Sequence, residues 1–214
     1  MATTNIMITG VGGQGSLLAS RILGNTFMSL GYDVKVSEVH GMSQRGGSVV
    51  TYVKYGDEVA SPVICKGEAD FLISFELLEA ARWLPYLKKD GVVVTSTQSI
   101  NPMPVIMGVK EYPENIAEKI EAKGIKLMKA DALAVAEECG SSKASNVVLI
   151  GMFAKHSDIP KEEYIKALVA TREDEDLNIF RTFMTTMMEQ NLLNEITTYL
   201  ESIDEVESRE KTTQ

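Results

Sequence analysis

Residues near the start of the chain have the types and spacing of a loop that receives an anion. The apolar run Ile6-Met7-Ile8 leads into Gly10-Val11-Gly12-Gly13-Gln14-Gly15, and an uninterrupted helical pattern begins at Ser16. In this order the first glycine allows a sharp turn, the second admits a ligand to bare backbone, and the third permits close helix–strand packing. The free N–H groups of the first helical turn favour an anion. The alternative interpretation is a purely structural turn.

A second glycine-rich loop, His40-Gly41-Met42-Ser43-Gln44-Arg45-Gly46-Gly47, follows an expected second strand at residues 34–36. Arg45 has the geometry to clamp a carboxylate or phosphate through two N–H donors, or to form an inter-strand or subunit salt bridge. His40 is the better functional candidate of the two histidines, although an ordinary loop histidine is the simpler interpretation.

Glu38 lies where a dinucleotide-binding fold places the acidic residue that holds a ribose. Together with Gly10–Gly15 it supports one hypothesis, a stand-alone NAD(P)- or flavin-binding dehydrogenase. The polar loop after Glu38 and the strand pattern at residues 48–54 argue against that hypothesis, because they interrupt the alternation of strands and helices.

The sequence offers no clear catalytic or metal-binding set. Cys65 and Cys139 are too few for a disulfide framework and form no CxxC pair. Even with His40 and His156 they provide no ligand set for zinc or an iron–sulfur cluster. We therefore assign no catalytic residue and no metal ligand to this chain.

The wider pattern predicts an α/β fold: a doubly wound, mostly parallel Rossmann-like sheet with an antiparallel β-hairpin addition and C-terminal helices. The β-branched run at residues 91–95 is typical of a buried strand parallel to the first. Residues 48–54 and 59–64, joined by a turn at 55–57, fit a hairpin. Residues 98–114 are expected to form a loop with a short extended piece, and Ser145 or Asn146 to cap a helix at 147–154.

Length and charge describe a globular chain with an acidic end. Its 214 residues fit one domain at 1–200, and we expect the last 14 to form an acidic, flexible tail. The net charge is −9, and residues 173–214 hold 11 acidic and 3 basic residues. A methionine-containing stripe from Leu177 to Leu200 predicts a last helix, with core and partner-facing interpretations both open. We expect no nucleic-acid surface and no membrane segment, and a cytoplasmic location.

Three segments together resemble one known family. GVGGQG near the start, SEVHGMSQRGGSV after the second strand and SNVVLIG near residue 150 are similar to the gamma-type domain of 2-oxoacid:ferredoxin oxidoreductases. Within that family the chain is most similar to the separate beta subunits of indolepyruvate:ferredoxin oxidoreductases. The similarity covers roughly residues 4–200, and the loop at 42–47 is its most distinctive part.

The resemblance implies a subunit of an assembly that oxidatively decarboxylates arylpyruvates to aryl-acetyl-CoA, CO₂ and reduced ferredoxin. It also implies that a large partner subunit carries thiamine diphosphate, magnesium and the iron–sulfur clusters, and receives ferredoxin. No cofactor is assigned to this chain, which lacks a GDG…NN-type motif; CoA is expected, if anywhere, at the interface. A non-catalytic assembly module is a further alternative.

The residues that match the family's motifs are expected to converge at the carboxyl ends of the strands, facing the partner's thiamine site or CoA. They are Gly10, Gly12, Gly13, Gln14, Gly15, Ser43, Gln44, Arg45, Gly46, Gly47 and Asn146.

Overall fold

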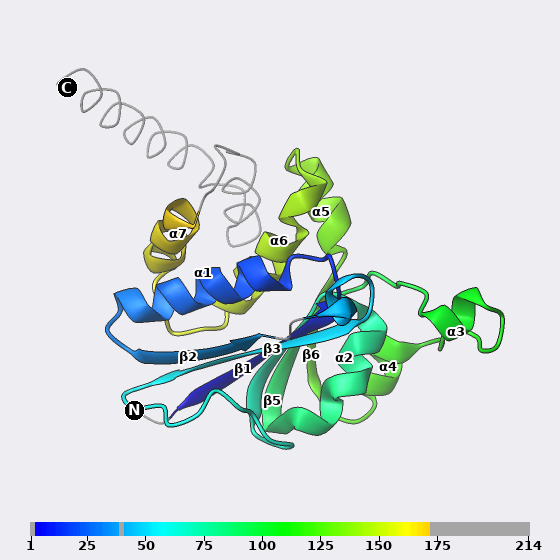
Figure 1. Cartoon of the computed structure of the whole chain (residues 1–214), viewed down its shortest axis with the longest axis horizontal. Coiled ribbons are helices and arrows are strands. Elements are labelled where there is room, and N and C mark those ends of the chain that lie inside the picture. Colours follow the sequence, from blue (N-terminus) through cyan, green and yellow to red (C-terminus); the bar gives the residue numbers. More distant parts are fainter. Residues whose placement is uncertain (1–2, 39–40, 172–214) are drawn as a thin grey trace.

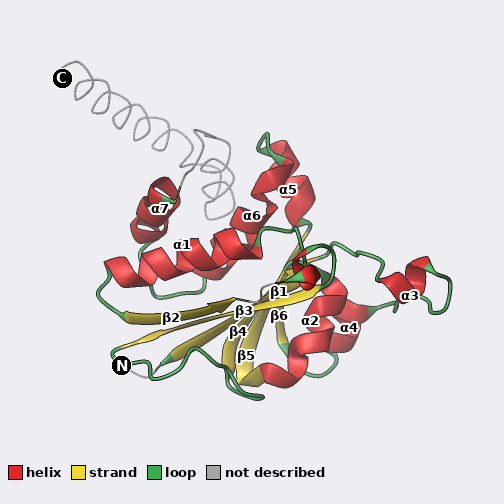
Figure 2. Ribbon diagram, viewed as in Figure 1, coloured by secondary structure: helices red, strands yellow, loops and turns green. Residues whose placement is uncertain are grey.

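A computed structural model describes residues 3–38 and 41–171 of the chain, which form a six-stranded sheet with helices on both faces (Figures 1 and 2). The strands are β1 (Thr4–Val11), β2 (Asp33–Glu38), β3 (Ser48–Gly56), β4 (Ala69–Ser74), β5 (Leu87–Ser96) and β6 (Lys126–Ala130). The α-helices are α1 (Ser16–Ser29), α2 (Leu77–Trp83), α3 (Met103–Ile106), α4 (Ile116–Glu121), α5 (Ala132–Glu138), α6 (Ser145–Ala154) and α7 (Lys161–Ala170). Short 3₁₀ turns lie at Met42–Gln44, Leu84–Tyr86 and Ser142–Ala144.

The sheet has the strand order β2-β3-β1-β4-β5-β6 and confirms the predicted fold class. Strands β1, β4, β5 and β6 pair in parallel, whereas β3 pairs antiparallel with both β1 and β2. The antiparallel addition is therefore β3, placed between the first two strands along the chain. As a result, β2 runs in the direction of β1 without being its neighbour.

The hairpin predicted at residues 59–64 is wrong, because that segment contains no strand. The backbone and side chains of this segment make other contacts instead. The N–H of Val59 donates to the Asp33 carboxylate at 2.8 Å, and Ile64 is buried beneath the sheet. Residues 48–54 pair instead with β1 on one side and with β2 on the other.

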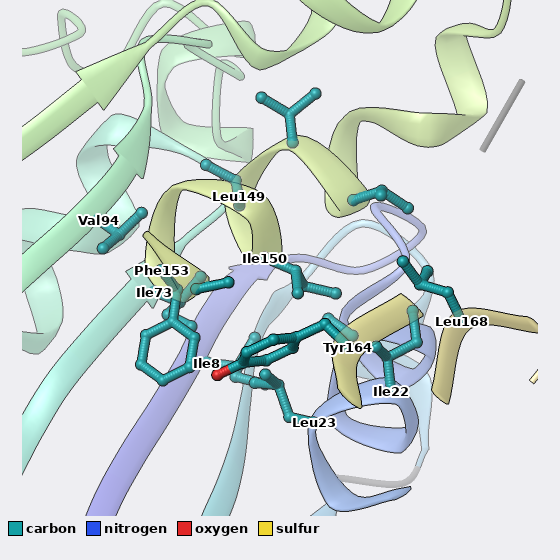
Figure 3. Packing of buried hydrophobic residues seen from close by; sticks show 14 of the residues in the cluster. Ile8, Ile22, Leu23, Ile73, Val94, Leu149, Ile150, Phe153, Tyr164 and Leu168 are labelled. Carbon is teal, nitrogen blue, oxygen red and sulfur yellow. The ribbon is translucent and has the colours of Figure 1, made fainter. Parts of the chain in front are cut away.

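The middle segments of the central strands, such as Ile6–Ile8 and Val92–Val94, are apolar because both faces of the sheet are covered there. Successive residues alternate between two cores: Ile6 and Ile8 pack with α1, α6 and α7, whereas Met7 packs with α2 and α4. Figure 3 shows the larger core, in which Ile8 of β1 lies among side chains from α1, α6 and α7. This double burial makes β1 a rigid support for the glycine loop that follows it.

Two further local predictions are wrong. Residues 98–114 contain the short helix α3 rather than an extended piece, and α6 has Ala144 as its N-cap rather than Ser145 or Asn146. The latter shift follows from the 3₁₀ turn that leads directly into α6. Asp131 caps α5 by accepting the N–H of Ala134 at 3.0 Å, and Gly31 ends α1 with a φ of 84°. The predicted last helix and acidic tail lie outside the described residues.

Gly24, inside α1, provides a test of the packing of α1 on the sheet. A Cβ at this position would lie 3.7 Å from Val36 Cγ2, which is ordinary contact. Because glycine in a helix interior loses more backbone freedom on folding than alanine, we expect Gly24→Ala to raise the free energy of unfolding by roughly 0.5–1 kcal/mol. Denaturant unfolding measures this change. The matched variant Gly31→Ala changes a residue in the left-handed conformation and should instead lower the free energy of unfolding by about 1 kcal/mol. A lower free energy of unfolding in both variants would contradict the packing described for α1.

Candidate functional site

Both glycine-rich loops lie at the edge of the sheet where the parallel strands end. The first loop follows β1 directly, and the second leads into β3, which is antiparallel to β1 and therefore begins at that edge. Val11 pairs with Ser48, so the two loops continue from opposite strands of one ladder. The predicted convergence of the loops at the carboxyl ends of the strands is confirmed.

The two loops are packed backbone against backbone at Gly12. The N–H of Gly12 donates to the carbonyl of Gly47 at 2.9 Å, and the N–H of Gly47 donates to the carbonyl of Ser43 at 2.9 Å. A Cβ on Gly12 would lie 2.3 Å from the carbonyl carbon of Gln44 and 2.4 Å from the carbonyl oxygen of Ser43. The second glycine-rich loop thus covers the backbone at Gly12, which the sequence pattern predicted to be open to a ligand.

Gln14 ties three strand ends together. Its Oε1 accepts the N–H of Val11 at 2.7 Å, and its Nε2 donates to the carbonyl of Phe75 and to Gln98 Oε1, both at 3.0 Å. Val11 is the last residue of β1, whereas Phe75 and Gln98 follow β4 and β5. Gly10 leaves room for this arrangement, since a Cβ there would lie 2.9 Å from Gln14 Oε1.

Asn146 brings the start of α6 to the first loop, although 131 residues separate the two in sequence. The side chain is buried, and its Nδ2 donates to the Gly15 carbonyl at 3.4 Å. Gly15 has a φ of +87°, and a Cβ there would lie 2.8 Å from Asn146 Nδ2. The three segments that carry the family resemblance therefore meet in space.

A cavity of about 350 Å³ opens beside the loops. It is lined by Gly12, Gly13, Gly15, Ser16, Leu17, Gln44, Val49, Val50 and Thr51, a set without a charged side chain. Arg45 and Gly46 lie exposed in the second loop next to this lining. The predicted residues are thus of two kinds: Gly10, Gly12, Gln14 and Asn146 make internal contacts, whereas Gly13, Arg45 and Gly46 face solvent.

Glu38 is not placed as a ribose-binding residue. Its Oε1 accepts a hydrogen bond from Ser20 Oγ of α1 at 2.8 Å. Strand β3 separates β2 from β1, so the end of β2 is not adjacent to the first glycine loop in the sheet. Together with the covered Gly12, this geometry does not favour the dinucleotide-binding alternative. His40 lies outside the described residues.

Comparison with known proteins now decides the family. Residues 5–180 match the family described as pyruvate ferredoxin/flavodoxin oxidoreductase. The chain belongs to this family. It is 44% identical over 173 residues to "Indolepyruvate oxidoreductase subunit IorB" of Thermococcus kodakarensis, covering 79% of this chain and 86% of that protein. The corresponding subunit of Archaeoglobus fulgidus is 39% identical over 158 residues, covering 73% of this chain and 78% of the relative.

Solved structures show the same fold for this family member. The gamma subunit of a keto/oxoacid ferredoxin oxidoreductase from Geobacter sulfurreducens gives a TM-score of 0.61 at 20% identity, covering 86% of this chain and 95% of that chain. The pyruvate oxidoreductase subunit PORC from Thermotoga maritima gives a TM-score of 0.65 at 16% identity, covering 87% of this chain and 96% of that chain.

Glu76 lies next to Phe75 as the N-cap of α2, and its structural role was not predicted from the sequence. It is fully buried and caps α2, with one carboxylate oxygen accepting the N–H of Glu79 at 2.8 Å. The other oxygen accepts the N–H of Ile100 at 3.1 Å and the hydroxyl of Tyr112. The only local signal for this role is a glutamate directly before a helix with a second one three residues later, which resembles a capping box.

Burial, reinforced by the hydrogen bond to Glu76, raises the pKa of Tyr112 to about 12. The folded protein therefore keeps the Tyr112 proton at pH values where an unfolded chain, with a tyrosine pKa near 10, releases it. Any stability from this difference is present below pH 10 and is lost as the pH rises towards 12. In an absorbance titration at 295 nm, we expect the difference between wild type and Tyr112→Phe to appear near pH 12. A difference centred near pH 10 would contradict the buried contact.

Metal ligation finds no support among residues 3–38 and 41–171, which contain no group of three or more His, Cys, Asp or Glu side chains arranged to hold an ion. Cys65 is exposed and Cys139 is buried, each as a free thiol. This donor set does not fit an iron–sulfur cluster. Within the same residues, no helix combines the length and apolar character needed to cross a membrane.

Proposed function

We propose that this chain is the small subunit of a heteromeric indolepyruvate:ferredoxin oxidoreductase. The observation that carries the proposal is the 44% identity to IorB subunits over most of both chains. The chain is a subunit of a heteromeric 2-oxoacid:ferredoxin oxidoreductase, and its specific reaction is the decarboxylation of arylpyruvates to aryl-acetyl-CoA and CO₂ with reduction of ferredoxin. A cytoplasmic location stays a prediction.

The cysteine content of this chain supports a division of roles between the subunits of the assembly. With two cysteines in the whole sequence, it lacks the thiolates that an iron–sulfur cluster requires. In keeping with the family resemblance, we place thiamine diphosphate, magnesium and the clusters on a large partner subunit, through which ferredoxin reacts. This chain contributes a shaped surface at the carboxyl edge of its sheet.

The exposed part of the two glycine-rich loops is the surface we assign to the partner's active site. Gly13, Arg45 and Gly46 are exposed there, beside the cavity lined by the first loop. Arg45 supplies a planar cation with paired donors, which suits a phosphate or carboxylate of CoA or of the partner. The internal contacts of Gly12, Gln14 and Asn146 hold this surface in one shape.

Arg45→Ala tests this role in the reconstituted complex. We expect the KM for CoA to rise, or the turnover to fall, roughly tenfold, which corresponds to one charge-assisted contact of about 1.4 kcal/mol. The free energy of unfolding should change by less than about 0.5 kcal/mol because the side chain is exposed. Lys166→Ala, an exposed cation on α7, is the matched control. Unchanged assembly, KM and turnover would remove the role of Arg45.

A non-catalytic assembly module is the second candidate function. The observation that favours it is that several predicted site residues make contacts inside this chain. Variants of exposed positions in both loops, combined in one chain, separate the two candidates. A combined variant that supports full turnover would favour the assembly module.

A further inference from the structure

An arm of residues 100–112 leaves the body of the protein between β5 and α4. Figure 1 shows α3 standing away from the sheet at the end of this arm. Four apolar side chains on it are largely exposed: Met103 (64%), Ile106 (65%), Met107 (68%) and Val109 (69%). Contiguous exposed apolar side chains mark interaction sites more often than isolated ones do.

The base of the arm is fixed to the body at both ends. Glu76, buried at the start of α2, accepts hydrogen bonds from the N–H of Ile100 and the hydroxyl of Tyr112. Just before the arm, the carbonyl of Gln98 accepts the N–H of Leu77 at 3.0 Å, and the Gln98 side chain accepts Gln14 Nε2. The arm is thereby held at the same edge as the glycine loops.

Backbone groups at the tip of the arm form hydrogen bonds with one another. The N–H groups of Ile106 and Met107 donate to the carbonyls of Pro102 and Met103 at 3.1 and 2.9 Å, and that of Val109 donates to Pro104 at 2.9 Å. A closed turn with fixed ends loses little conformational freedom when it binds, which favours affinity.

The chemistry of the tip indicates an apolar occupant. No charged residue occurs from position 91 to 109, in a chain of which 24% of residues are charged. Interface cores are depleted in charge and enriched in methionine in the same way. This chain functions within a heteromer, and the arm is continuous with the edge of the sheet that we assign to the partner. The large subunit is therefore the protein that best fits as the binding partner of the arm.

We propose that the arm inserts its tip into an apolar groove on the large subunit and so sets the position of the glycine loops over the partner's site. This inference rests on the proposed function. It assigns the docking contact to Met103, Ile106, Met107 and Val109, and it makes Glu76 a positioning residue for that contact.

The test measures the dissociation constant between the full-length chain and the large subunit, purified with its cofactors, by sedimentation or surface-bound titration. Ile106→Asp and Met107→Asp should each weaken binding roughly 30-fold, as expected for a central interface side chain. Met28→Asp, at a 55% exposed apolar position on α1, is the matched control and should stay within about threefold. Unfolding midpoints of the isolated variants confirm that each chain is folded.

The outcomes separate the docking contact from the proposed function. If the wild-type chain fails to bind the large subunit, the proposed function falls and the docking contact falls with it. If the wild type binds and the arm variants bind as tightly as the control, the arm proposal is wrong while the proposed function stands. If the arm variants abolish self-association of the isolated chain and leave the heteromer intact, the occupant is a second copy and the proposal is overturned.

Discussion

Replacing Gly12 with alanine is expected to lower the free energy of unfolding by about 2–3 kcal/mol, the cost of overpacking a closely packed site. The added Cβ would fall 2.3–2.4 Å from backbone atoms of Ser43 and Gln44, which cannot rotate away as a flexible side chain would. The hydrogen bond from Gly12 N–H to the Gly47 carbonyl would be lost as the loops separate. Denaturant unfolding of the isolated chain measures the effect.

Gly12→Ala also tests the link between the loops and activity. Because the second loop carries Arg45, its displacement should reduce turnover of the reconstituted complex by at least as much as Arg45→Ala does. Gly24→Ala is the control for the glycine-to-alanine change itself, since its Cβ makes ordinary contact. Wild-type stability and turnover for Gly12→Ala would mean that the two loops do not pack as described.

Removing the Glu76 carboxylate should have the other large effect. Glu76→Ala leaves the N–H groups of Glu79 and Ile100 and the Tyr112 hydroxyl without their acceptor. Losing a helix cap and leaving buried donors unpaired costs roughly 3–4 kcal/mol in free energy of unfolding. Denaturant unfolding measures this loss, and faster amide hydrogen exchange of residues 100–112 should accompany it.

Two variants make the Glu76 result specific. Tyr112→Phe removes one of the donors and should cost about 1 kcal/mol. Glu111→Ala, which removes an exposed carboxylate on the same arm, should change stability by less than about 0.5 kcal/mol. An unaltered exchange rate across the arm in Glu76→Ala would contradict the anchoring contact.

Local patterns along the chain were enough to predict the fold class. The strand–glycine–helix order at residues 6–16 and the β-branched run at 91–95 specify buried parallel strands, and both are found in the sheet. Each pattern is read within one element, where apolar spacing and glycine placement determine the outcome. The family resemblance led to the further prediction that the two glycine-rich loops lie close together.

Pairings between distant segments could not be read in the same way. Whether residues 48–56 pair with β1 and β2 or with the segment at 59–64 depends on competition between partners, and Val59 is taken by Asp33. Likewise, nothing local to Glu76 indicates that it will be buried and bonded to Tyr112, 36 residues away. Only the tertiary fold creates such contacts.

The most direct test of the account is an anaerobic assay of arylpyruvate-dependent ferredoxin reduction with CoA, using this chain, the large subunit, and the two combined. We predict no activity from this chain alone and full activity only from the combined subunits, with thiamine diphosphate and iron–sulfur clusters recovered on the large one. A chain that binds a nicotinamide nucleotide or flavin and turns over a substrate alone would contradict the account, and so would a large subunit that is fully active without it.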